Sequence, residues 1–185
     1  MNRSSYKVAL GGVISAMCLL GMFLTGVIPF LNITLPMIAG VLITVIAIEV
    51  NSPWAVMTYI AVSFLSIFVT FDKTSALLFI LFFGHYPIIK PKLEKMTLRP
   101  AVLAVKLLIF NVCIVAYYEL TIYLLGIKDY MNDFPLFGKY AIYAAWGFSN
   151  VLFLMYDYSL SGVMELYIRW LKPKIFGSKR NNDHS

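Results

Sequence analysis

The sequence has little charge, and this shortage already restricts what the protein is. Only 13% of its 185 residues are Asp, Glu, Lys or Arg, whereas 61% are hydrophobic, a composition outside the range of soluble globular proteins. No charge occurs over the 41 residues from Val8 to Ile48, from Val50 to Phe71, or from Thr74 to Ile89. A membrane-spanning helix needs about 20 apolar residues. The composition therefore predicts an integral membrane protein and excludes nucleic-acid-binding modules, disordered tails and disulfide-built secreted domains.

Histidine and cysteine are also scarce, which removes support for metal sites and for most catalytic centres. The two cysteines, Cys18 and Cys113, lie in apolar stretches with no Cys-x-x-Cys pair and no neighbouring histidine. His85, in Gly84-His85-Tyr86-Pro87, has no acidic partner nearby in the sequence and is expected at the wet end of a helix. There is no G-x-S-x-G, no H-E-x-x-H and no glycine-rich phosphate loop. We expect no enzyme activity, no catalytic residue, no cofactor and no metal.

The apolar segments that remain predict an all-α fold, a polytopic bundle of six transmembrane helices in a single membrane domain over residues 1–185. Asn51-Ser52-Pro53 is typical of a turn that starts a helix, with Ser52 as the expected cap. The fourth segment has only 16 uncharged residues, about 24 Å as a helix, and is therefore expected to be short for the bilayer. The spans are expected at roughly 8–30, 35–50, 54–71, 74–89, 101–127 and 140–161, followed by a polar cytoplasmic tail at 172–185.

The distribution of basic residues predicts the orientation, because cytoplasmic loops are enriched in Lys and Arg. With six spans, eleven of the fifteen basic residues fall on the side of the termini, and three, Lys73, Lys128 and Lys139, fall on the other side. Lys106 alone lies within a span, and its long side chain is expected to reach back to the inner headgroups. We therefore expect a plasma-membrane protein with both termini cytoplasmic. The eleven are Arg3, Lys7, Lys90, Lys92, Lys95, Arg99, Arg169, Lys172, Lys174, Lys179 and Arg180.

Polar residues in the later spans form the predicted ligand site. Asn111, Tyr118 and Glu119 recur at helical spacing on one side of the fifth segment, and Trp146 and Asn150 share a face of the sixth. Together with Asn32 and Thr34 in the first outer loop, they combine aromatic walls with a few polar groups, the usual constitution of a small-molecule site. The alternative is a network of hydrogen bonds between helices that only holds the bundle together. Both interpretations of Glu119 stay open at this point.

Small residues in the first span provide a second kind of signal. Gly11 and Ser15, and likewise Gly12 and Ala16, follow the small-xxx-small pattern that lets two helices approach closely. The helix that packs against these small residues belongs either to this bundle, which is the commoner case, or to a partner protein.

The segment Ala9-Leu10-Gly11-Gly12-Val13-Ile14-Ser15-Ala16, the loop Asn32-Ile33-Thr34 and the Asn-Ser-Pro turn resemble substrate-binding S components of energy-coupling factor (ECF) transporters. That resemblance covers about Val8 to Leu160 and implies a six-helix membrane protein that captures a small, vitamin-like micronutrient. It also implies docking through Gly12 and Ala16 on a transmembrane coupling subunit that works with ATPases. The family usually has Ala at both docking positions, so Gly12 is a departure.

A second class of function needs no ligand pocket. In that alternative, the chain is a non-transport assembly or scaffold subunit of a membrane complex, and the small-residue stripe and the basic segment Lys90 to Arg99 bind other subunits. An intramembrane enzyme is a third class, with the least support. In every case the lipid bilayer is the expected partner, and nucleic acid is not.

Overall fold

The computed structural model describes residues 3–96, 98–126 and 141–172, and all regular structure within these ranges is helical. The chain forms two compact units, Met1–Leu136 and Phe137–Ser185, which are described separately below. Five helices in the described ranges are long and apolar enough to cross a membrane, and α2 (Thr34–Glu49) is a shorter apolar helix. The all-helical class is therefore confirmed. A sixth spanning helix stays a prediction.

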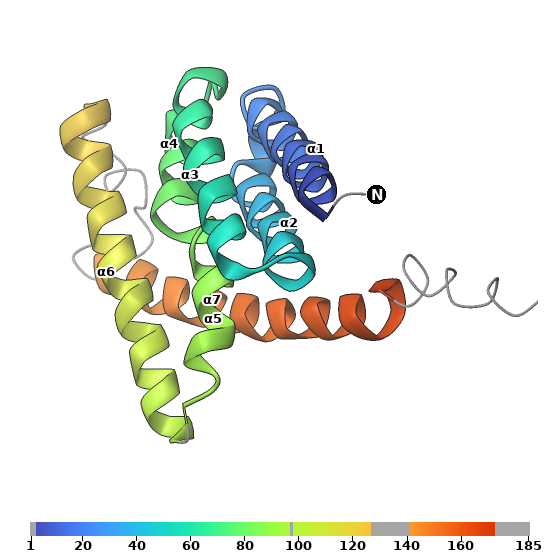
Figure 1. Ribbon diagram of the computed structural model, residues 1–185. Coiled ribbons are helices and arrows are strands. Elements are labelled where there is room, and N and C mark those ends of the chain that lie inside the picture. Colours follow the sequence, from blue (N-terminus) through green and yellow to red (C-terminus); the bar gives the residue numbers. More distant parts are fainter. Residues whose placement is uncertain (1–2, 97, 127–140, 173–185) are drawn as a thin grey trace, which may run out of the picture. The chain divides into compact units, whose positions relative to one another are not determined.

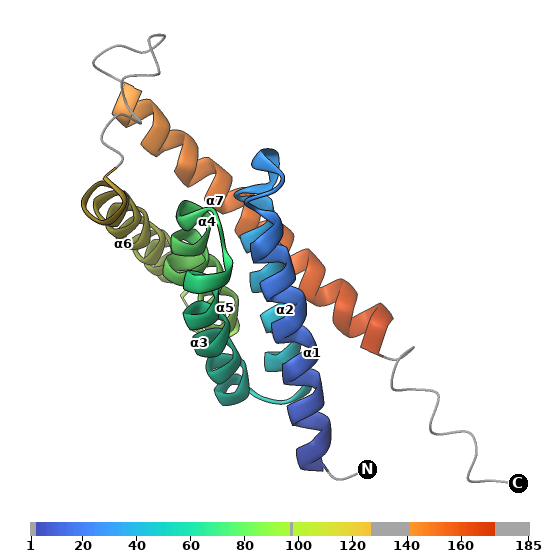
Figure 2. The same cartoon turned by 90° about the horizontal axis from the view of Figure 1, so that it is seen from above.

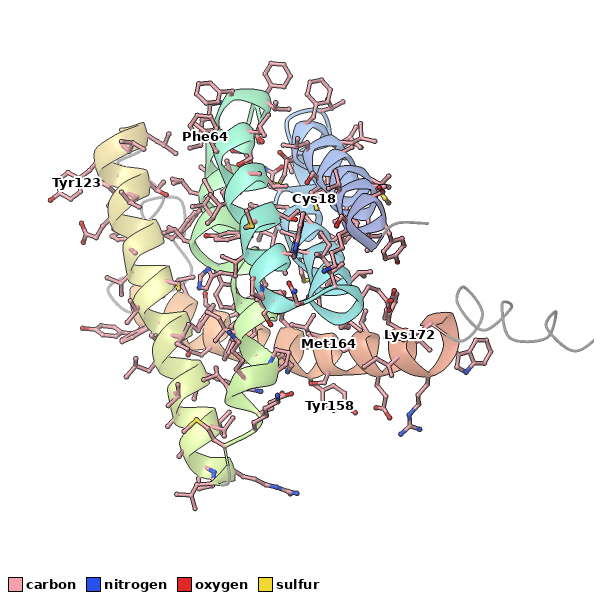
Figure 3. The ribbon with its side chains drawn as sticks, in the orientation of Figure 1. Cys18, Phe64, Tyr123, Tyr158, Met164 and Lys172 are labelled. Atoms are coloured by element: carbon pink, nitrogen blue, oxygen red, sulfur yellow. The ribbon has the colours of Figure 1, made fainter. Side chains whose placement is uncertain are left out.

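The surface of the first unit has the character expected of a membrane protein. Large apolar and aromatic side chains are exposed around its helices, including Phe68 at 72% and Tyr123 at 83%. Tyr123 points away from the neighbouring helices in Figure 3, whereas Cys18 lies inside, with its thiol 3.4 Å from the carbonyl oxygen of Ala39. Soluble monomers rarely expose such extensive apolar surface. These exposed side chains are compatible with contact to the lipid of a membrane.

The first unit is built around α2. This helix packs against both α1 (Arg3–Leu24) and α3 (Ser52–Val69), which also contact each other (Figures 1 and 2). Its buried side includes Ala39, Gly40 and Ile43. At Gly40 a Cβ atom would lie 2.0 Å from the carbonyl oxygen of Phe83. A hydrogen at this position therefore lets the backbone of a neighbouring helix contact α2 directly.

The turns between these helices are fixed by side-chain caps. Asn51 caps α3, since its Oδ1 accepts a hydrogen bond of 3.0 Å from the backbone N–H of Trp54. The expected cap, Ser52, is instead the first helical residue, so that prediction was wrong by one position. Asp72 caps the next helix in the same way, through the N–H of Thr74 at 3.1 Å. Both caps satisfy N–H groups that a helix start leaves free.

The fourth segment consists of α4 (Lys73–Leu78), the π-helical segment η2 (Phe79–Phe83) and α5 (Tyr86–Leu93). As one apolar helix of 21 residues it extends over about 30 Å, the thickness of the hydrocarbon core. The expected short span at 74–89 is corrected accordingly. The helix extends past the predicted end because Lys90, which was expected in a loop, lies on α5 and is fully buried.

The π-helical segment is held by contacts from α3. The N–H of Gly84 bonds the carbonyl of Phe79 at 2.8 Å, five residues back, and the hydroxyl of Tyr59 donates to the carbonyl of Ile80 at 2.6 Å. A Cβ atom on Gly84 would lie 2.5 Å from the ring of Tyr59. A π turn weakens the regular ladder of carbonyl bonds. Tyr59 supplies a donor where that ladder is altered.

Two long helices complete the described chain. In the first unit, α6 (Arg99–Leu125) packs on α4, η2 and α5 and ends at Gly126, whose φ of 68° is the left-handed conformation typical of a helix end. In the second unit, α7 (Ala141–Leu166) continues into the π-helical η4 (Tyr167–Leu171), beyond the predicted end at 161. The predicted outer loop 128–139 and nearly all of the predicted tail lie outside the described residues.

Candidate functional site

The turn between α1 and α2, predicted to lie on the outer side, contains the first part of the predicted ligand site. It includes the short 3₁₀ helix η1 (Pro29–Leu31), followed by Asn32 and then by Thr34, the first residue of α2. Both Asn32 and Thr34 are half-buried. Asn32 Oδ1 is buried, and no described residue donates a hydrogen bond to it. Because a buried acceptor without a donor costs about 1–3 kcal/mol, this oxygen suits a donor from a ligand or from water.

This turn is fastened to the loop between α3 and α4. The hydroxyl oxygen of Ser75 lies 2.8 Å from the carbonyl oxygen of Asn32 and 2.5 Å from Asp72 Oδ2. A hydroxyl has one proton, so Ser75 shares it between the two acceptors. Apolar contact adds to this link, because the rings of Phe23 and Phe71 are 5.3 Å apart. The turn between α1 and α2 and the loop between α3 and α4 are therefore linked by a hydrogen bond and by an aromatic contact.

The predicted polar side of α6 is not covered by the other helices of the first unit. Tyr118 is 40% exposed and Glu119 is exposed as well. Asn111 is half-buried and donates from Nδ2 to the carbonyl of Leu107 at 2.8 Å, within its own helix. Within the first unit, Tyr118 and Glu119 on this face are therefore not enclosed by other helices. In both views α4 stands between the Asn32 turn and α6 (Figures 1 and 2).

The corresponding residues of the sixth segment lie in the second unit, on α7. Trp146 is 47% exposed. Asn150 donates from Nδ2 to the carbonyl of Trp146 at 2.9 Å, and Ser149 bonds the carbonyl of Ala145 in the same way. The predicted pocket draws on both units, and the structure describes each group of residues within its own unit. The ligand site therefore stays a prediction.

A cluster of three charged side chains joins α5 to α6 at the other end of the first unit. Glu94 Oε1 is 3.0 Å from Lys90 Nζ and 2.8 Å from Lys106 Nζ. The side chains of Lys90 and Lys106 are 0% and 7% exposed, whereas that of Glu94 is 41% exposed. Lys106 was expected to reach the headgroups, but it is directed to Glu94 instead. The physical reason is that an ammonium group in an apolar surrounding is stabilised by a nearby carboxylate.

The two ammonium groups also affect the acidity of Glu94. Partial burial is the largest single cause and raises the pKa of this carboxyl, but the hydrogen bonds and the positive charges of Lys106 and Lys90 together lower it by more, so the net pKa lies below the ordinary value. Glu94 therefore stays ionised under ordinary conditions and compensates the charge of its two partners.

His85 lies deeper in its span than the sequence suggested. It sits between η2 and α5, well before the end of the span at Leu93, and is half-buried with its ring centre 6.1 Å from that of Tyr59. It directly precedes α5, which continues through Lys90, and its predicted position at the wet end of a helix stays a prediction. Across the described residues, no three His, Cys, Asp or Glu side chains are grouped as metal ligands would be.

The small residues of α1 divide into an inner and an outer stripe. Gly11 is buried, and a Cβ atom there would lie 3.7 Å from the hydroxyl oxygen of Thr58 on α3. Gly12 and Ala16 are exposed, and a Cβ atom on Gly12 would meet nothing within 4 Å. Packing within the first unit therefore uses Gly11 and leaves the Gly12/Ala16 face open.

Sequence reasoning missed the roles of Glu94, Tyr59 and Ser75. The i, i+4 spacing of Lys90 and Glu94 was a usable signal for an ion pair on a helix. No local pattern signals the contacts of Tyr59 or Ser75, whose partners are 21 and 43 residues away in the sequence.

Comparison of the chain with family models, with curated proteins and with solved structures found no match.

Proposed function

We propose that this protein is a membrane-embedded substrate-capture subunit for uptake of a small, vitamin-like micronutrient, and that it docks on a separate coupling and ATPase module. The observation that carries the proposal is the open Gly12/Ala16 face of α1, beside a Gly11 that is already used for packing. A glycine stripe directed away from its own unit lets a foreign helix approach closely.

The predicted capture site supports the same function. Asn32 supplies a buried acceptor to which no described residue donates, and Glu119 supplies an exposed carboxylate on α6. With Thr34, Asn111 and Tyr118 in the first unit, and Trp146 and Asn150 in the second, these groups provide the sparse polar contacts and aromatic surface that small-molecule sites use.

An assembly subunit without a ligand is the competing function. Asn111 and Asn150 each donate to a carbonyl of their own helix, an arrangement that requires no ligand. The two functions differ in whether a small molecule stabilises the protein.

The test combines a docking arm and a ligand arm. In the docking arm, the chain is purified from its native membranes, and the double variant Gly12→Leu/Ala16→Leu is expected to lose copurifying coupling subunit and ATPase. Val13→Leu/Met17→Leu is the matched control, because both side chains are exposed and already large. In the ligand arm, a panel of vitamins is screened by thermal shift, and Glu119→Gln is expected to weaken a hit about 5- to 150-fold, the loss of one buried polar contact. Copurification of an ATPase with both double variants alike would exclude docking through this face. Docking without any vitamin hit would favour the assembly subunit.

A further inference from the structure

Three basic side chains, in the turn between α5 and α6 and on the two helix ends beside it, are not neutralised by any described acid. Lys92, Lys95 and Arg99 are exposed, and their side chains form no hydrogen bond or ion pair with any described residue. The one nearby acid, Glu94, already contacts Lys90 and Lys106. The surface of this turn is therefore an uncompensated positive patch, made of Lys92, Lys95 and Arg99.

The position of the patch determines which anion it meets. It extends from Lys92, in the last turn of the candidate span that ends at Leu93, to Arg99, where the next span starts (Figure 1). A turn that joins two spans without further chain lies at the level of the lipid headgroups. The anions held at that level are the phosphate groups of lipids.

Apolar side chains on the same turn point to lipid rather than to a dissolved anion. Met96 and Leu98 are 47% and 67% exposed and lie between Lys95 and Arg99 in the sequence. Exposed apolar side chains among cations are typical of segments that insert into the boundary between headgroups and acyl chains. A dissolved phosphate or an acidic protein surface would offer no apolar contact to Met96 and Leu98.

We infer that the α5–α6 turn binds anionic phospholipid, with Lys92, Lys95 and Arg99 contacting the headgroup phosphates while Met96 and Leu98 lie against the upper acyl chains. The ion cluster beneath the turn contributes by engaging Glu94, which would otherwise repel the same phosphates. This lipid site is independent of whether the protein captures a micronutrient.

The test measures lipid selectivity with the full-length chain. Protein in detergent micelles is equilibrated with equal amounts of phosphatidylglycerol and phosphatidylcholine, and the bound lipids are counted by native mass spectrometry. We expect a preference for phosphatidylglycerol that falls about fivefold for each cation removed in Lys92→Gln, Lys95→Gln and Arg99→Gln. The charge-preserving set Lys92→Arg/Lys95→Arg/Arg99→Lys is the matched control and should keep the preference.

Two further measurements separate the alternatives. The thermal midpoint in detergent micelles that contain phosphatidylcholine as the only lipid should be the same for wild type and the single Gln variants, because none of the three side chains has a described polar partner. Inorganic phosphate at millimolar concentration should not displace phosphatidylglycerol. The inference is overturned if the Gln variants keep the wild-type preference, if the charge-preserving control loses it, or if inorganic phosphate competes fully.

Discussion

Glu94 carries one negative charge for two ammonium groups, so we expect its replacement to lower the stability of the first unit strongly. Breaking a buried ion pair costs up to about 3–5 kcal/mol, but Glu94 is 41% exposed, so for Glu94→Gln we expect a loss of about 1–3 kcal/mol. Thermal unfolding in detergent measures it. Glu165→Gln is the control, since Glu165 pairs with Arg169 at 2.7 Å with both side chains exposed, and the variant should cost less than about 1 kcal/mol. Equal losses in the two variants would contradict a special role for Glu94.

The same carboxylate gives a pH dependence with a definite sign. Its pKa is lower in the folded protein than the ordinary value of 4.5, so folding favours the ionised form. The contribution is fully present above pH 4.5 and is lost as pH falls through the folded pKa. Wild type should therefore lose more stability than Glu94→Gln on acidification below this point.

Residue chemistry was the least predictable level from the sequence. The sequence identified Lys106 as an unusual charge within a span, but its partner Glu94 lies 12 residues away across a turn, and the choice between headgroup and carboxylate depends on how α5 and α6 pack. For the same reason Asn32 was recognised as a polar loop residue, whereas its link to Ser75 was not.

At the scale of elements, the contact between α2 and the fourth segment depends on the absence of a side chain at Gly40. Gly40→Ala should destabilise the first unit by about 1–3 kcal/mol, because the added methyl group meets the carbonyl of Phe83 and forces the helices apart. Gly12→Ala is the matched control and should be neutral or stabilising by up to about 1 kcal/mol, since its methyl group meets nothing. Thermal unfolding of the two variants decides; a stable Gly40→Ala protein would mean that the helices can separate freely.

Helix positions were far more predictable than helix contacts. Uncharged runs located α3 and α6 to within two residues and α1 to within six, because the hydrophobic pattern is set by the solvent rather than by a particular neighbour. The end of the fourth segment was misjudged because a buried, paired Lys90 looks like a loop residue in the sequence. Whether the predicted ligand residues on α6 and α7 form one site depends on the packing of two units, which local patterns do not encode.

At the scale of the whole molecule, the basic residues predict on which side of the membrane each turn lies. In a background without Cys18 and Cys113, a cysteine at Lys92 should react with a membrane-impermeant reagent only after the cells are opened. A cysteine at Val27, which is 59% exposed in the turn after α1, should react from outside intact cells. Labelling of both positions from the same side would show that α2, α3 and the fourth segment, which lie between the two positions, do not cross the membrane three times as predicted.

The π-helical segment Phe79–Phe83 has a consequence for comparing this chain with any relative found later. One π turn accommodates an additional residue, and each residue advances a helix by about 100°. The extra residue therefore sets the angular phase of α5, and with it the direction in which Glu94 meets Lys106 on α6. A homologue that lacks this insertion would align with a one-residue gap inside 79–83. Its counterpart of the Lys90–Glu94–Lys106 cluster would have to be formed by residues at different positions.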